Sequence, residues 1–240
     1  MSTFVLVHGA WHGAWCWERV APLLREAGQR VITPDLPGHG ADRTPPWRVT
    51  LGSYARRVRN AAREGGERAI AVGHSMDGVV ITQAAAREPG LFAGLVYVCA
   101  FVPEPGESLM TLARQDRDSR LRDAMVNGIT HSTVMPGRAA DIFYGACSAE
   151  AASAAVARLG PQPSLPAFQR VAKPRGPQPA RAYIECTEDR AIGIALQRQM
   201  RERTGIARVA TLATDHSPFY SAAEMLAGEL NELAAFFAAA

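Results

Sequence analysis

Long apolar segments are missing from this sequence of 240 residues. No run approaches the roughly 20 consecutive apolar residues that a membrane-spanning helix needs. The apolar stretch at 4–7 is too short for a signal peptide, and no basic residue precedes it. We therefore expect a cytoplasmic protein without a membrane partner.

Cysteine is also scarce, and its spacing excludes the common metal and redox motifs. The four cysteines lie far apart with no C-x-x-C pair, which favours buried free thiols over disulfides or metal ligands. His8 and His12 are a candidate metal pair at i, i+4, but they flank a glycine turn and no third ligand has suitable spacing. We predict no metal and no cofactor. The cysteines are Cys16, Cys99, Cys147 and Cys186.

The chain has no strong excess of either charge. With 26 basic and 23 acidic residues, the formal net charge is +3. The densest basic run, at 56–63, fits one helix and indicates a solvated helix face, so we expect no nucleic-acid partner. A composition of 48% hydrophobic and 20% charged residues is typical of a globular domain. The sequence leaves a homodimer open.

Short β-branched runs alternate with longer helical patterns along most of the chain. This alternation is typical of an α/β fold, with a mainly parallel twisted sheet covered by helices on both faces. The expected strands are 3–8, 30–33, 69–72, 95–101, 181–186 and 207–212. The expected helices are 15–27, 51–63, 76–87, 192–203 and 222–238.

One long segment, 103–179, interrupts the alternation. It contains no convincing strand, has helical stretches around 109–125 and 149–159, and ends in a proline-rich connector over 161–179. An insertion of this length between two strands is usually functional, so we predict a helical cap over the active-site edge of a core formed by 1–102 and 180–240. The alternative is an excursion without function.

Ser75 lies where a strand pattern turns sharply into a helix. The sequence Gly73-His-Ser-Met-Asp-Gly78 follows an apolar strand and precedes a helical stretch, as in a nucleophile elbow. Such a turn lifts the serine above the sheet in a strained backbone conformation. The motif predicts an α/β-hydrolase fold with Ser75 as the nucleophile; an ordinary turn serine is the alternative.

A nucleophilic serine needs a base and an acid that orients the base. In this fold both follow the serine in the order acid, then histidine, each just after a strand. Asp189 and His216 follow the last two expected strands, and His216 is the only histidine in the last hundred residues. We predict Asp189 as the acid and His216 as the base. The competing acids are Glu188, Asp215 and Glu104.

The negative charge that develops on the substrate oxygen needs two converging N–H groups. One is expected from Met76, the residue after the nucleophile. The other is expected from Ala10, in the tight loop after the first strand. These amides would form the oxyanion hole.

Several blocks of this sequence resemble the plant methylesterase and hydroxynitrile lyase family and its bacterial relatives. They follow one another over nearly the whole chain, with only the cap unmatched, and imply an α/β-hydrolase with this family's chemistry. The blocks are Phe4–Trp17 (FVLVHGAWHGAWCW), Gly73–Met76 (GHSM), Ala100–Pro103 (AFVP), Tyr183–Asp189 (YIECTED) and Asp215–His216.

Two positions separate the chemistries of that family. By resemblance, its cyanohydrin-cleaving members carry a threonine after the first His-Gly and a lysine after the histidine of the triad. This chain has Ala10 in place of the threonine and Ser217 in place of the lysine, so it lacks both the threonine hydroxyl and the cation. The resemblance thus implies an ester hydrolase that acts on a small apolar ester through an acyl-serine. Carbon–carbon lyase or decarboxylase chemistry and a ligand-binding protein with a weakened site are the alternatives.

Asp77 departs from the family pattern, which has glycine two residues after the serine. A carboxylate about 6 to 7 Å from the oxyanion would oppose it by about 2 to 3 kcal/mol at an effective dielectric of 20. That is about a hundredfold in rate. The residue is a tolerated variation, a specialisation away from hydrolysis, or a substitution introduced on purpose. We expect Asp77→Gly to raise ester turnover.

The substrate pocket is expected between the sheet and the cap. Large apolar side chains near the predicted site favour an apolar ester, although the same residues could simply belong to the core. The residues predicted to line it are Trp11, His12, His74, Asp77, Phe101, Leu109, Met110 and Met125.

Overall fold

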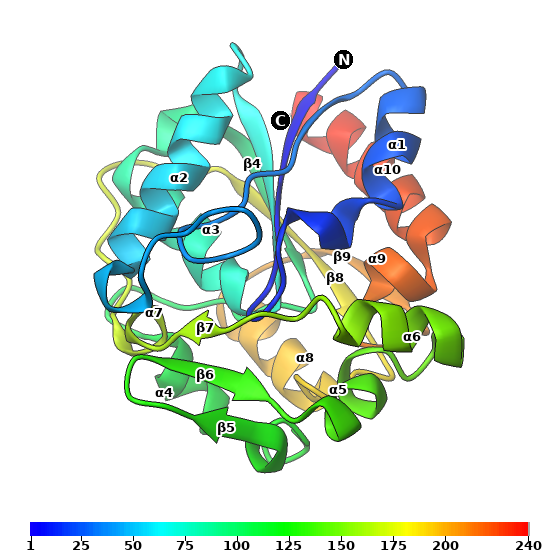
Figure 1. Cartoon of the computed structure of the whole chain (residues 1–240). Coiled ribbons are helices and arrows are strands. Elements are labelled where there is room, and N and C mark those ends of the chain that lie inside the picture. The colour runs from blue at the N-terminus through cyan, green and yellow to red at the C-terminus, as the bar shows by residue number, and fades with distance from the viewer. Residues whose placement is uncertain (240) are drawn as a thin grey trace.

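A single parallel sheet of six strands forms the centre of the molecule (Figure 1). The computed structural model describes residues 1–239. The strand order is β2-β1-β3-β4-β8-β9, and every neighbouring pair is parallel. The fold is therefore the predicted α/β-hydrolase fold. The strands are β1 (Thr3–Val7), β2 (Arg30–Ile32), β3 (Ala69–His74), β4 (Phe92–Val98), β8 (Ala180–Cys186) and β9 (Arg208–Leu212).

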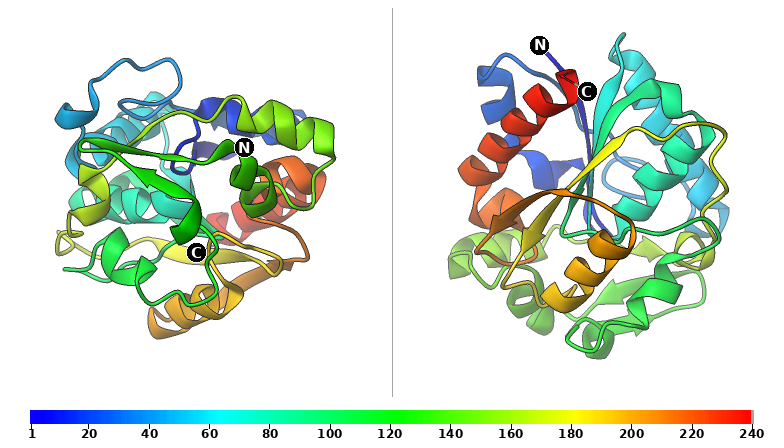
Figure 2. Two further views of the ribbon diagram at one scale, coloured as in Figure 1. Left: turned by 60° about the horizontal axis from the view of Figure 1, so that its bottom comes forward. Right: turned by 180° about the vertical axis from the view of Figure 1, so that it is seen from behind.

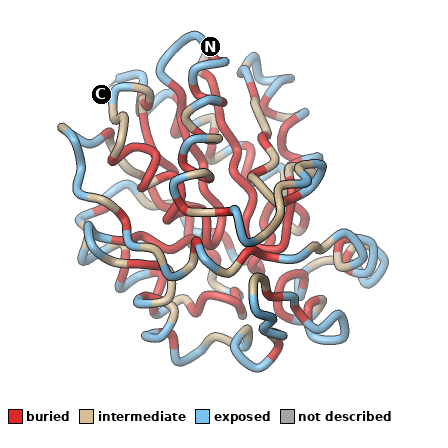
Figure 3. Tube along the Cα trace, turned by 60° about the vertical axis from the view of Figure 1, so that its left-hand side comes forward, coloured by how far each residue is buried: buried red, intermediate tan, exposed pale blue. Residues whose placement is uncertain are grey.

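The central strands are apolar because both faces of the sheet are covered. All residues of β1 and β3 are buried, and the buried backbone in Figure 3 runs through the middle of the molecule. Strands covered on both faces read as continuous apolar runs instead of alternating patterns. This accounts for the unbroken Val, Ile, Leu and Ala runs in the sequence.

Helices pack on both faces of the sheet (Figures 1 and 2). Helix α1 (Val20–Glu26) lies against α10 (Ala223–Ala238) on one face, and α2 (Leu51–Glu64) lies against α3 (Gly78–Arg87) on the other. Helix α8 (Ile194–Arg203) packs against β8. A capping box between Thr50 and Ser53 fixes the start of α2. These elements agree closely with the predicted helices.

The insertion between β4 and β8 lies across the carboxyl ends of the central strands (Figure 2, left). It contains the helices α4 (Leu109–Ala113), α5 (Pro136–Phe143), α6 (Ala149–Val156) and α7 (Leu165–Phe168). The expectation that it has no strand was wrong, because it also contains a small antiparallel sheet, β5-β6-β7. These strands are β5 (Met125–Asn127), β6 (His131–Val134) and β7 (Gln162–Pro163). The helical stretches expected around 109–125 are α4 and a short turn at Arg122–Ala124.

Several short helical turns complete the chain. Within residues 1–239, no helix is both long and apolar enough to cross a membrane. All four cysteines are free thiols; three are buried and Cys147 is partly exposed. The turns are η1 (Ala14–Trp17), η2 (Pro46–Arg48), η3 (Ser75–Asp77), η4 (Pro89–Leu91), η5 (Arg122–Ala124) and α9 (Pro218–Ser221).

Candidate active site

Ser75 lies at the sharp turn between β3 and η3, in a left-handed backbone conformation with φ of 56°. Two glycines make room for this turn. A Cβ on Gly73 would lie 2.6 Å from the carbonyl oxygen of Asp77, and one on Gly78 would lie 2.2 Å from that of Phe101. A strained non-glycine residue persists only where its surroundings hold it, and such residues cluster at functional sites.

A hydrogen-bonded chain joins the three residues predicted for catalysis. His216 Nε2 lies 2.9 Å from Ser75 Oγ, and His216 Nδ1 lies 2.7 Å from Asp189 Oδ2. Since a carboxylate only accepts, Nδ1 carries the proton and the Nε2 lone pair faces the serine hydroxyl. The exposed fraction is 8% for Ser75 and 2% for His216. The fold thus brings together three side chains from three strand ends.

Four donors hold the Asp189 carboxylate. Its Oδ1 accepts from the backbone N–H groups of Ala191 and Ile192 at 2.7 and 2.9 Å. Its Oδ2 accepts from Gln197 Nε2 at 3.1 Å, in addition to His216. Gln197 is fully buried. Four hydrogen bonds of this kind fix the orientation of the carboxylate.

The three competing acids lie elsewhere. Glu188 is exposed, and Glu104 is exposed beside Arg203. Asp215 accepts from the Ser217 N–H at 3.0 Å and from the Ala146 N–H at 2.8 Å. Asp215 therefore connects the loop of His216 to the cap without contacting the imidazole in any hydrogen bond of the described chain.

His216 is also held through its backbone. Its carbonyl oxygen accepts from His74 Nε2 at 2.7 Å and from Cys99 Sγ at 3.4 Å. Cys99 and Gln197 were not predicted from the sequence, and His74 was predicted to line the substrate pocket. In the structure His74 is fully buried beneath the serine turn and supports His216. Cys99 has a left-handed φ of 34° in the structure, but no sequence pattern points to this residue.

The loop after β1 packs directly on the serine turn. A Cβ on Gly9 would lie 3.0 Å from the Cβ of Ser75, so the glycine allows this contact. The Ala10 amide follows, and within residues 1–239 it donates to no protein acceptor. The Met76 amide lies in the first turn of η3, where N–H groups have no acceptor within the helix. Both amides are available to a ligand oxygen.

Asp77 is fully buried, and neither of its carboxyl oxygens has a hydrogen-bond partner within the described chain. Burial raises the pKa of this carboxyl well above its ordinary value. A buried charge without a partner is too costly, so the group takes up a proton instead. The expectation of a charged carboxylate opposing the oxyanion does not fit this environment.

The nitrogens of His8 and His12 already have protein partners. His8 Nδ1 donates to the Gly9 carbonyl at 2.9 Å, and His8 Nε2 accepts from the Leu36 N–H at 3.2 Å. His12 lies between the Ala10 carbonyl and the Tyr144 hydroxyl, each at 2.7 Å. Burial lowers the pKa of His12 to about 3. Both imidazoles act as neutral connectors within the core.

The donor atoms of His74, Cys99 and His216 form a compact group within 4.8 Å of one another. The imidazole nitrogens of His216 are bonded to Ser75 and Asp189, and His74 Nε2 donates to a carbonyl. This group is therefore part of the serine site; three of its four imidazole nitrogens have protein partners, and His74 Nδ1 has none within the described residues.

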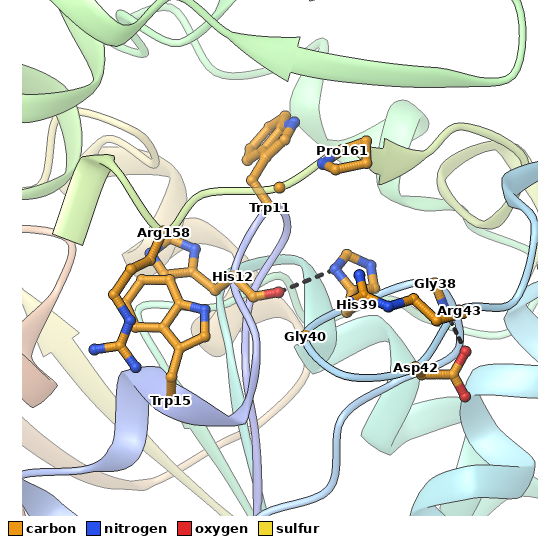
Figure 4. Close-up of a pocket in the computed structure, with 11 residues that line it drawn as sticks. Trp11, His12, Trp15, Gly38, His39, Gly40, Asp42, Arg43, Arg158 and Pro161 are labelled. Carbon is orange, nitrogen blue, oxygen red and sulfur yellow. Dashed lines mark hydrogen bonds between the residues drawn. The ribbon is translucent and has the colours of Figure 1, made fainter.

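A surface cleft of about 440 Å³ flanks the loop after β1 (Figure 4). Of the residues predicted for the substrate pocket, only Trp11 and His12 line it. Phe101, His74 and Asp77 are buried, and the other three are partly exposed. Those three are Leu109, Met110 and Met125.

Phe143 of the cap covers the serine site. Its ring centroid lies 5.7 Å from that of His216 and 5.9 Å from that of Trp11. The cap therefore covers the triad. Phe143 was not among the residues predicted for the site.

The model of the alpha/beta hydrolase family matches residues 4–229. The chain belongs to the alpha/beta hydrolase family. This hydrolase is 47% identical to the carbendazim hydrolyzing esterase of Nocardioides sp. over 114 residues, which are 47% of each chain. It is 30% identical to the pyrethroid hydrolase of Sphingobium wenxiniae, over 98% of this chain and 88% of the relative.

A solved methylesterase from Arabidopsis matches this hydrolase with a TM-score of 0.84 at 25% identity, over 98% of this chain and 100% of the other. The predicted resemblance to methylesterases and bacterial esterases is confirmed. These relatives are named as esterases or hydrolases and none of the three as a lyase. The chain is a carboxylic ester hydrolase.

Proposed function

We propose that this hydrolase cleaves its ester through an acyl-enzyme on Ser75. Ser75 Oγ attacks the ester carbonyl carbon while its proton passes to His216 Nε2. The oxyanion of the tetrahedral intermediate accepts hydrogen bonds from the amides of Ala10 and Met76. When the intermediate collapses, the alcohol leaves with the proton held by His216.

Deacylation repeats these steps with water. His216 takes a proton from the water as its oxygen attacks the acyl carbon, and then returns the proton to Ser75 Oγ as the acid product leaves. Throughout, Asp189 stabilises the imidazolium without taking its proton. The observation that carries the proposal is the chain of hydrogen bonds of 2.9 and 2.7 Å from Ser75 through His216 to Asp189.

We further propose a small, largely apolar ester as the substrate. The ring of Phe143 covers the site, and the nearby Trp11 adds a second apolar surface. An enclosure of this kind favours apolar groups over charged ones. The named substrates of the relatives, carbendazim and pyrethroids, make these compounds suitable first candidates.

Steady-state kinetics on a panel of activated esters and cyanohydrins tests the proposal. We expect ester turnover by the parent chain and none above background by Ser75→Ala. Cyanohydrin cleavage should be absent, since Ala10 lacks the threonine hydroxyl and Ser217 lacks the positive charge that stabilises departing cyanide. Ester turnover that survives in Ser75→Ala would refute the nucleophile. Cyanohydrin cleavage faster than ester cleavage would favour the lyase.

A further inference from the structure

The loop that carries the Ala10 amide is held mainly from outside the core. Trp11, the next residue, has a left-handed φ of 62°, an unusual conformation for a bulky side chain. Such a conformation needs support from its surroundings. Much of this support comes from the cap insertion.

The peptide group between Ala10 and Trp11 is fixed at both ends. Its carbonyl oxygen accepts from His12 Nδ1 at 2.7 Å, and its N–H donates to Gln162 Oε1 at 3.3 Å. Gln162 belongs to β7 of the cap. Only the two backbone torsions of Ala10, φ and ψ, separate this peptide group from the one that carries the Ala10 amide.

His12 connects the carbonyl of Ala10 to the cap. Since a carbonyl only accepts, His12 Nδ1 carries the proton and Nε2 accepts from the hydroxyl of Tyr144 at 2.7 Å. Tyr144 follows α5 and is 1% exposed. Burial raises the pKa of its hydroxyl, which therefore remains a donor. By donating to Nε2, Tyr144 selects the His12 tautomer whose Nδ1 proton holds the Ala10 carbonyl.

Two further hydrogen bonds join Trp11 to the cap. Its indole Nε1 donates to the Ser132 carbonyl at 3.2 Å, and its carbonyl accepts from the Gly160 N–H at 2.8 Å. In Figure 4 the indole of Trp11 extends away from the core toward the cap, and Pro161 lies beside the loop. With Tyr144 and Gln162, four cap residues therefore hold a stretch of three loop residues.

We propose that docking of the cap assembles the oxyanion hole, with Tyr144 and Gln162 as positioning residues for the Ala10 amide. This inference rests on the proposed function of that amide. Because Ser75 is almost fully enclosed, the cap must move to admit an ester. That movement releases the loop, and closure restores the donor geometry. Hydrolysis is then restricted to the closed state.

The test compares Tyr144→Phe and Gln162→Met with Tyr220→Phe as the matched control. Tyr220 is also buried, and its hydroxyl donates to Glu18 and accepts from Arg158 of the cap at 3.3 Å, without contacting the loop. Removal of a whole oxyanion donor costs about a hundredfold or more in kcat. For a donor that is only loosened, we expect kcat to fall about tenfold in each test variant, with KM within about twofold.

A transition-state readout separates positioning from general loosening. An alkyl trifluoromethyl ketone forms a hemiketal oxyanion with the serine, so its inhibition constant should rise by the same factor as kcat falls. His12→Asn, which retains a donor for the Ala10 carbonyl, should lose less activity than His12→Leu. Thermal unfolding confirms that each variant is folded.

An unchanged kcat in both Tyr144→Phe and Gln162→Met would overturn the inference. An equal fall in Tyr220→Phe would also overturn it, since cap anchoring in general would then explain the loss. Failure of the proposed function is distinguishable, because it would appear as ester turnover that survives in Ser75→Ala.

Discussion

At the scale of single residues, the unpaired carboxyl of Asp77 should set part of the pH dependence of stability. Its pKa is raised in the folded state, so the stability it contributes is present below the unfolded value of 3.8 and is lost as the pH rises through the folded pKa. The free energy of unfolding of Asp77→Asn should therefore exceed that of the parent, by a difference that grows by up to about 1.4 kcal/mol per pH unit above 3.8. Urea unfolding at pH 4 and pH 8 measures this, and a constant difference would contradict it.

The same burial changes the expected effect of Asp77 on catalysis. A neutral carboxyl does not repel the oxyanion as a carboxylate would. The rise in ester turnover for Asp77→Gly should therefore be well below the hundredfold expected for a charge, and under about tenfold in kcat. Parallel kinetics on the parent, Asp77→Gly and Asp77→Asn check this. A hundredfold gain in both variants would show that the group is ionised.

The residues at the strand ends could be placed from sequence, and those supporting them could not. Ser75, Asp189 and His216 each follow an apolar strand, and carboxyl ends of parallel strands meet at one edge. Cys99 contacts the carbonyl of His216, 117 positions along the chain. Gln197 contacts the carboxylate of Asp189, 8 positions away. Such contacts depend on side-chain packing, which leaves no spacing pattern in the chain.

At the scale of elements, close approach at the start of α3 explains why glycine occupies position 78. A Cβ there would meet the Phe101 carbonyl at 2.2 Å, whereas one on Gly228 of α10 would meet nothing within 4 Å. Gly78→Ala should destabilise the fold by about 1 to 3 kcal/mol. Gly228→Ala should stabilise it by about 0.5 to 1 kcal/mol. Urea unfolding compares them, and equal effects would contradict the packing argument.

Elements of the sheet were easier to predict than those of the cap. The expected strand at 95–101 lies at Phe92–Val98, a shift of three residues, and the other five agree more closely. The strands of the cap are two to four residues long, and β7 contains a proline. Short, partly polar strands have too little periodicity to be distinguished from loops.

At the scale of the whole molecule, buried neutral histidines should make the fold sensitive to acid. Burial lowers the pKa of His8, His12, His39 and His74 below 6.5. The unfolded chain binds more protons below that pH, so stability is present above it and is lost as the pH falls. Each group contributes up to about 1.4 kcal/mol per pH unit. His39→Gln should reduce this slope, measured by urea unfolding at pH 5 and 7.5, and an unchanged slope would contradict the prediction.

Covalent labelling shows directly whether Ser75 is the nucleophile. A fluorophosphonate phosphorylates or phosphonylates only an activated serine, and intact mass followed by peptide mapping locates the adduct. The structure predicts one adduct per chain on Ser75, strongly slowed in Asp189→Asn and absent in Ser75→Ala. No adduct at any pH between about 6 and 9, or an adduct that persists in Ser75→Ala, would contradict it.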